Sequence, residues 1–368
     1  MIQTEEALRR RECLDMALCA IALRAILFAV ICLRGHLGAR SAASLYDGRS
    51  YLLSAQAMLG DWRGFDDFQG RVFPGFPLLI ALLHKAGLPL EAAGVGLDWI
   101  CAGAAAALAA LVFNNRRVGW AMVILIPHYL MNSSLVLSEA PLLAFSLAAL
   151  WLLQRGRGAT GGIVMGFAAL VRPMACFFLG GGMYVQLRQK RRGQAILSLL
   201  GAGGVVVAGL LLVRFWRGDA WAQIRYYANS PNAYGGQLFT WPFHALLCVP
   251  GEKNVPAWRT GYIWLHAAVA LMACTVLLAA MLRKNSDPRD QLAAPWLWGN
   301  TLFALCIGSV WGFECFHRFT IPAQPAMFWA LRGILPRRRI TWLMVGATSF
   351  AIALSSVLHD LPGLPAAR

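Results

Sequence analysis

The chain has 368 residues, of which 58% are hydrophobic and 14% are charged, and its mean hydropathy is +0.57. A soluble domain of this size is far less apolar, so the composition predicts an integral membrane protein. The net charge is +16, but the basic residues recur in short clusters between apolar runs. Nucleic-acid binding needs a contiguous basic surface, so we expect membrane lipids and no nucleic acid as partners.

Six apolar runs approach or reach the roughly 20 residues that cross the hydrocarbon core of a bilayer. Shorter apolar runs between them predict broken or tilted helices. The first run follows three arginines, as in a signal peptide, but its length of about 18 residues exceeds the usual signal core and predicts an uncleaved anchor. The six runs are residues 16–33, 96–113, 195–215, 262–282, 292–311 and 340–358.

The basic clusters predict an orientation, because Arg and Lys gather in the cytoplasmic turns of membrane proteins. Reversing the chain at each cluster gives an all-α polytopic protein of about eleven transmembrane helices, forming a single domain over residues 1–368. Residues 35–75 and 216–260 then form two long extracytoplasmic segments. Alanine- and arginine-rich composition without a retention signal favours the inner membrane of a bacterium. The clusters are residues 9–11, 116–117, 155–157, 188–192, 283–284 and 337–339.

The first outer segment contains a predicted amphipathic helix, because apolar residues from Tyr51 to Leu59 fall at i, i+1, i+4, i+7 and i+8. We expect this helix to lie in the membrane interface. Further along, Pro74 and Pro77 predict an extended approach followed by the first turn of another helix.

The second outer segment is rich in aromatic residues. Such rings are more often a belt at the level of the lipid headgroups, and the alternative is that they stack on a sugar or grip an isoprenoid tail. The aromatic residues are Trp216, Trp221, Tyr226, Tyr227, Tyr234, Phe239, Trp241 and Phe243. Between the two segments, glycines at 161, 162 and 166 predict close helix packing.

Asp47 is the first candidate catalytic residue. A carboxylate just outside the bilayer, at the mouth of a helical bundle, is where a membrane enzyme would keep a base that works on a lipid-linked substrate. The simpler alternative is that Asp47 caps the helix that follows it.

Glu139 and Arg172 lie in or next to apolar helix ends, where an unpaired charge costs on the order of 2 to 3 kcal/mol or more. Each therefore needs a partner. Pairing of Glu139 with Arg172, or of Asp47 with an arginine, would meet that need without catalysis. The helix dipole would also favour Glu139 in a first turn, and Arg172-Pro173 would end a helix. The functional alternative for Arg172 is a contact with phosphate.

The chain has no Walker loop, dinucleotide fingerprint, nucleophile elbow or zinc spacing, so ATP hydrolysis, hydride transfer and serine hydrolysis have no support. No metal site is predicted. A divalent cation that bridges Asp47 or Glu139 to a phosphate stays open, and no cofactor is required.

An ordered set of short motifs resembles the GT-C class of membrane glycosyltransferases, in the branches of the protein O-mannosyltransferases and the PIG-V-like mannosyltransferases. The family often has a second acidic residue directly after the first, where this chain has Gly48. The motifs are Asp47-x3-Tyr51-x3-Ala55, Arg71-x2-Pro74-Gly75-Phe76-Pro77, Ser138-Glu139-Ala140-Pro141, Val171-Arg172-Pro173 and Arg318-Phe319-x2-Pro322-x2-Pro325.

The resemblance implies an inverting transfer of a sugar from a polyprenyl-phosphate donor to an acceptor at the extracytoplasmic face, with Asp47 as general base. Arginines match phosphate oxygens bidentately, so we expect basic residues of the outer side to contact the donor phosphate. Neither the sugar nor the acceptor follows from the resemblance. The expected phosphate contacts are Arg172, Arg318, His317 and Arg71, with Glu139, Tyr51 and Arg49 as supporting residues.

Two alternatives stay open. A transporter or flippase of a lipid-linked saccharide usually shows repeated halves and ionisable residues near the bilayer midplane. A membrane subunit without catalysis predicts that replacement of Asp47 has no effect on transfer.

Overall fold

The computed structural model describes residues 2–229, 239–247, 257–283, 285–308 and 315–360. Parts of the second outer segment, Tyr234 among them, lie outside these residues. Within them the chain is helical and has no strand; an isolated antiparallel bridge joins Phe239 to Ile307.

Among the described residues, five helices are long and apolar enough to cross a membrane, so the chain is an α-helical membrane protein. They coincide with five of the six predicted runs. The sixth, predicted at 292–311, is shifted: α16 (Pro288–Cys306) begins before residue 292 and ends at Cys306, Ile307 has extended backbone, and residues 309–311 lie outside the described residues. The five helices are α1 (Ile2–Arg34), α5 (Leu90–Phe113), α11 (Arg192–Arg217), α15 (Ala257–Met281) and α20 (Arg339–Asp360).

Shorter helices complete the bundle, as the short apolar runs predict. Pro127 lacks a backbone N–H and stands in the first turn of α7, so the path from α6 to α7 is broken there. The shorter helices are α6 (Arg116–Ile124), α7 (Pro127–Asn132), α8 (Glu139–Gln154), α9 (Gly158–Val171), α10 (Ala175–Arg188), α18 (Phe316–Thr320), η2 (Ile321–Ala323) and α19 (Gln324–Ala330).

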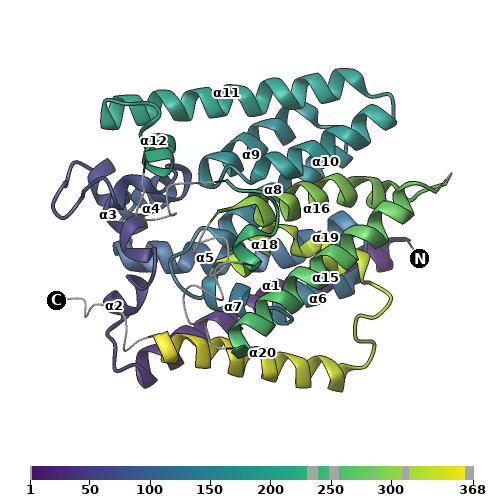
Figure 1. Ribbon diagram of the computed structural model, residues 1–368, viewed down its shortest axis with the longest axis horizontal. Coiled ribbons are helices and arrows are strands. Elements are labelled where there is room, and N and C mark those ends of the chain that lie inside the picture. The colour runs from purple at the N-terminus through teal and green to yellow at the C-terminus, as the bar shows by residue number, and fades with distance from the viewer. Residues whose placement is uncertain (1, 230–238, 248–256, 284, 309–314, 361–368) are drawn as a thin grey trace.

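The basic turns gather at one end of the bundle. In Figure 1 the start of α1, the turn from α10 to α11 and the turn from α15 to α16 all lie at the right. An ion pair of 3.0 Å between Arg116 and Glu12 joins the α6 and α1 ends there. At the opposite end lie α2 (Ala39–Ala43), α3 (Gly48–Met58) and α12 (Ala222–Asn229). The molecule therefore has one end at which these basic turns lie, called the basic end here, and an opposite, loop-rich end.

The loop-rich end contains the predicted amphipathic helix, α3. Its apolar residues Tyr51, Leu52 and Ala55 are buried, although Leu59 is exposed. The apolar face of α3 therefore packs against the protein, and this packing accounts for the amphipathic pattern. A single 3-10 turn, η1 (Gln69–Arg71), and α4 (Gly75–Lys85) follow, with Pro74 at the N-cap and Pro77 in the first turn of α4.

Close packing at the predicted glycines is confirmed. A Cβ atom on Gly162 of α9 would lie 2.2 Å from the carbonyl oxygen of Ser198 on α11, and one on Gly166 would lie 2.6 Å from that of Ala202. These glycines let the two backbones touch, which is how membrane helices without a hydrophobic driving force gain packing energy.

Replacing Gly162 with Ala should therefore destabilise the fold by about 1 to 3 kcal/mol, the usual cost of overpacking. Gly203 of α11 has open space around it, so Gly203→Ala serves as the matched control and should be neutral or raise stability by up to about 1 kcal/mol through helix propensity. Thermal unfolding of both variants in detergent checks this. Equal melting temperatures would show that α9 and α11 do not touch at Gly162.

Candidate functional site

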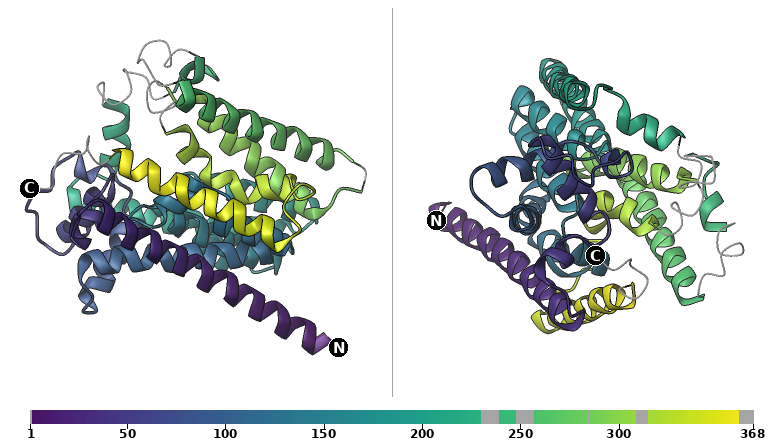
Figure 2. Two further views of the ribbon diagram at one scale, coloured as in Figure 1. Left: turned by 90° about the horizontal axis from the view of Figure 1, so that it is seen from below. Right: turned by 90° about the vertical axis from the view of Figure 1, so that its left-hand side faces the viewer.

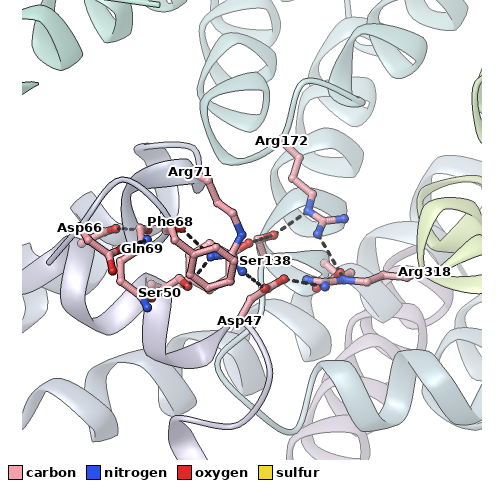
Figure 3. Close-up of polar contacts among 12 residues, drawn as sticks. Asp47, Ser50, Asp66, Phe68, Gln69, Arg71, Ser138, Arg172 and Arg318 are labelled. Atoms are coloured by element: carbon pink, nitrogen blue, oxygen red, sulfur yellow. Dashed lines mark hydrogen bonds and ion pairs between the residues drawn. The ribbon is translucent and has the colours of Figure 1, made fainter. Parts of the chain in front are cut away.

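Asp47 lies at the loop-rich end, directly before α3. Although it occupies the N-cap position, its side chain makes no capping hydrogen bond, so the capping alternative is wrong. The carboxylate instead accepts hydrogen bonds from two arginines that are far away in sequence (Figure 3). Arg71 donates to Oδ1 at 2.5 Å, and Arg318 donates to Oδ2 at 2.6 Å.

Glu139 is the second carboxylate of the site. It opens α8, as its sequence context predicts, and it is fully buried. The Nη2 atom of Arg172 lies 3.1 Å from Glu139 Oε1, and Arg318 Nε donates to the same oxygen. Arg318 therefore bridges Asp47 and Glu139. Together with Arg71, three guanidinium groups surround two carboxylates, which leaves one net positive charge.

Ser138 joins the network through a hydroxyl group to which the sequence assigned no role. Its Oγ accepts a hydrogen bond of 2.7 Å from Arg172 Nε and shares one of 2.6 Å with the hydroxyl of Tyr51. Arg172 follows the last residue of α9 and has extended backbone, as the Arg-Pro pair predicts. Ser138 and Glu139 thus hold Arg172 across from Asp47.

Arg71 is fixed by its own loop. Its Nη1 donates to Ser50 Oγ at 2.9 Å and to the carbonyl oxygen of Phe68 at 2.6 Å. The guanidinium carbon also lies 3.7 Å from the centre of the Phe68 ring, a cation–π distance. These contacts leave the Nη2 atom directed at Asp47 (Figure 3).

Four of the charged groups line a cavity of about 300 Å³ that also has a large apolar wall: Asp47, Arg71, Arg172 and Arg318. Phe73 and Tyr227 stack with ring centres 6.4 Å apart, and both line the cavity, so part of the aromatic outer segment contributes to it. Tyr226 and Phe239 of that segment line it too. Other members of the lining are Tyr51, Ile224, Met174, Phe303, Ile307, Cys315 and Phe319.

Two polar atoms of the network have no hydrogen-bond partner among the described residues. They are Arg318 Nη2 and Glu139 Oε2, and both are buried. A buried guanidinium N–H without a partner costs free energy comparable to a lost hydrogen bond. Arg318 lines the cavity, but its Nη2 atom is closed off, so a ligand oxygen would reach this donor only after neighbouring side chains moved.

The arginines determine the ionisation of Asp47. Burial raises the pKa of this carboxyl, but the charges of Arg318 and Arg71 outweigh burial and lower the pKa to about 2. Asp47 is therefore ionised at neutral pH and, while both arginines contact it, weakly basic. Burial raises the pKa of Tyr227 to about 12, so its hydroxyl stays neutral and able to donate.

Three predicted site residues lie outside the cavity lining: Glu139, which still joins the network through its two arginines, Arg49 and His317. Arg49 is exposed. His317 is adjacent to Arg318 in sequence, but its ring packs against that of His128, with 3.7 Å between the centres. Asp47, Tyr51, Arg71, Glu139, Arg172 and Arg318 come together in one network.

Two buried ionisable residues lie behind the site. Arg24 of α1 and Asp98 of α5 are both fully buried, and the sequence analysis did not single them out. Arg24 Nε donates to Ser133 Oγ at 2.8 Å, and Asp98 Oδ2 accepts from the backbone N–H of Leu137 at 2.7 Å. They hold the segment that leads into Ser138. The sequence could have revealed them, because each is an ionisable residue inside an apolar run.

No group of three His, Cys, Asp or Glu side chains that could hold a metal ion occurs in the part of the chain that the structure describes. Asp47 and Glu139 are the carboxylates beside the cavity that could bind a cation, and arginines contact both. In the comparisons with known proteins, no family model matches the chain and no curated protein matches significantly.

The ion pairs of Asp47 predict a pH dependence of stability. The pKa falls from 3.8 in the unfolded chain to about 2 in the folded protein, so the ionised group contributes about 2 kcal/mol above pH 4. This contribution is lost as the pH falls through 2. Asp47→Asn should thus lower stability at pH 7, and its difference from wild type should shrink below pH 4.

Unfolding of both proteins, followed between pH 2 and pH 7, checks this. Asp66→Asn is the control, because Asp66 is an exposed residue of the same loop. A difference between wild type and Asp47→Asn that stays constant with pH would contradict the ion pairs.

Proposed function

We propose that the protein is an inverting membrane glycosyltransferase that moves a sugar from a polyprenyl-phosphate donor to a hydroxyl acceptor. The observation that carries this proposal is the cavity in which three arginines and a carboxylate meet an apolar wall. A lipid-linked sugar phosphate has a matching group for each feature. Its phosphate suits the arginines, its apolar tail suits the wall, and the acceptor hydroxyl that attacks its anomeric carbon needs a base such as the carboxylate.

The arginines support the binding of phosphate. Guanidinium groups contact phosphate oxygens bidentately and stay charged at every accessible pH. The net positive charge of the network leaves capacity for an anion, which would also reach the unpartnered Nη2 of Arg318 after neighbouring side chains moved. A phosphate there would share Arg318 and Arg172 with the two carboxylates.

The apolar wall supports a lipid donor. Met174, Ile224, Phe303 and Phe319 offer the dispersion contacts that an isoprenoid chain needs, and the tyrosines can stack on a sugar ring. In this proposal the aromatic outer segment is part of the donor site.

Asp47 acts as the general base in the proposed reaction. It takes the proton of the acceptor hydroxyl while the hydroxyl oxygen forms a bond to the anomeric carbon. The bond from that carbon to the phosphate oxygen breaks on the opposite side, and polyprenyl phosphate leaves with the electron pair. The arginines stabilise the charge that develops on the leaving oxygen. No metal ion is required for these steps.

The membrane topology that we propose has eleven passes, a GT-C-like arrangement and the cavity at the extracytoplasmic face of a bacterial inner membrane. The separation of the basic turns from the Asp47 end supports this orientation, since basic turns face the cytoplasm.

The second candidate is a transporter or flippase of a lipid-linked saccharide. Arg24 and Asp98 favour it, because buried ionisable residues inside membrane helices often mark a transport path. Labelled lipid-linked sugar in proteoliposomes distinguishes the two. Without an acceptor, a transporter would move the labelled lipid from one leaflet of the membrane to the other, whereas the transferase would leave it in its original leaflet.

Asp47→Asn should lower transfer of label from a radiolabelled polyprenyl-phosphate sugar by about 10²- to 10⁴-fold, the usual contribution of a general base. Asp66→Asn should transfer normally. Because Asp47→Asn also weakens the fold, both variants are assayed at a temperature where circular dichroism shows them folded. If folded Asp47→Asn turns over nearly as fast as wild type, Asp47 is not the general base.

Arg172→Ala should weaken binding of a short-chain polyprenyl phosphate by about 10- to 100-fold, because hydrogen bonds to charged groups contribute about 1.5 to 3 kcal/mol. The exposed Arg49 supplies the control, Arg49→Ala, which should bind normally. Isothermal titration calorimetry measures both affinities. If Arg172→Ala keeps the affinity of wild type, Arg172 serves only to pair with Ser138 and Glu139.

A further inference from the structure

A second large cavity opens at the basic end of the bundle, far from Asp47. It is a groove of about 1040 Å³ between α1, α6 and α20. The views of Figure 2 show α1 and α20 side by side. All three helices start at the basic end and run in the same direction, so the groove has one charged end and one apolar end.

Charge gathers at the start of the groove. Its lining includes four arginines and two acidic residues, so the groove has an excess of positive charge. Glu12 pairs with Arg116 at 3.0 Å. Arg117, Arg337 and Arg339 have no ion pair with any described residue. The charged lining residues are Glu12, Asp15, Arg116, Arg117, Arg337 and Arg339.

The polarity of the lining changes with depth. Trp120 and Trp342 lie about one turn beyond the arginines of α6 and α20, the level at which indole rings favour the membrane interface. Ile26, Ile124 and Phe350 line the deeper part. From Arg339 to Phe350 the helix rises about 16 Å, close to half of the roughly 30 Å hydrocarbon core of a bilayer.

We propose that this groove binds one anionic phospholipid of the adjacent leaflet, with its phosphate at the arginines and an acyl chain along the apolar floor. The argument rests on charge complementarity, on the order of arginine, tryptophan and aliphatic residues, and on a length that fits one leaflet. Basic pockets between membrane helices at the cytoplasmic side recognise anionic headgroups. The site is independent of the proposed sugar transfer.

The groove is tested with dioleoylphosphatidylglycerol as the probe, added to the full-length protein in phosphatidylcholine nanodiscs. Native mass spectrometry after release into neutral detergent counts the retained lipid. Wild type should retain one phosphatidylglycerol per chain and gain thermal stability from it, whereas Arg337→Gln/Arg339→Gln should retain at least about tenfold less.

A matched control separates the groove from general attraction to positive charge. Arg188 and Arg192 lie at the turn from α10 to α11 and do not line the groove. Arg188→Gln/Arg192→Gln removes the same charge and should retain the lipid as wild type does. An equal loss in both double variants would overturn the proposal.

The apolar floor is tested without any change of charge. Gly346 lines the groove, and a Cβ atom there would lie 3.5 Å from Ile124 across it. Gly346→Leu should fill the floor and abolish retention while all arginines remain. Gly204→Leu, on an open face of α11, is its control. Retention by Gly346→Leu, or a lipid-free dimer of wild type, would overturn the proposal, since the groove would then hold only a surface headgroup or a second copy.

Discussion

The bridging of Asp47 and Glu139 by Arg318 is the interaction on which the site depends. Arg318 comes from α18, late in the chain, and its two carboxylate partners come from the start of α3 and the start of α8. A buried ion pair repays the desolvation of its charges only when the geometry is good, and loss of one partner costs about 3 to 5 kcal/mol. Arg318 therefore ties α18 to the starts of α3 and α8, and loss of this arginine would leave two carboxylates without one of their partners.

Neighbouring helices of the bundle position the other residues of this network. The segment that precedes Glu139 at the N-terminus of α8 is held by Arg24 and Asp98, whose side chains bond Ser133 and the backbone of Leu137. Arg172 leaves α9 at a proline and reaches Ser138. Helix ends thus place the charged side chains around one cavity.

Much of this arrangement follows from sequence, and the reasons for the failures are physical. The long helices were predictable because about 20 apolar residues have few alternatives to crossing a bilayer. The end of α16 was not, because the bridge of Ile307 to Phe239 depends on a distant segment. The need of Glu139 and Arg172 for partners was also predictable from the cost of unpaired charge. Ser138 was missed as a bridging residue, since a hydroxyl group can be satisfied almost anywhere and its position in a motif does not reveal its partner.

The resting network raises a question about Asp47 as a base, because two arginines make the carboxylate a weak one. In the proposed reaction, an anionic donor phosphate would resolve it. The phosphate would compete with Asp47 and Glu139 for the same guanidinium groups, and each contact that Arg318 transferred to phosphate would remove positive charge from Asp47. The pKa of Asp47 would then rise toward its ordinary value. In the proposed reaction, donor binding and activation of the base are therefore one electrostatic exchange, and without the donor the arginines keep the carboxylate inactive.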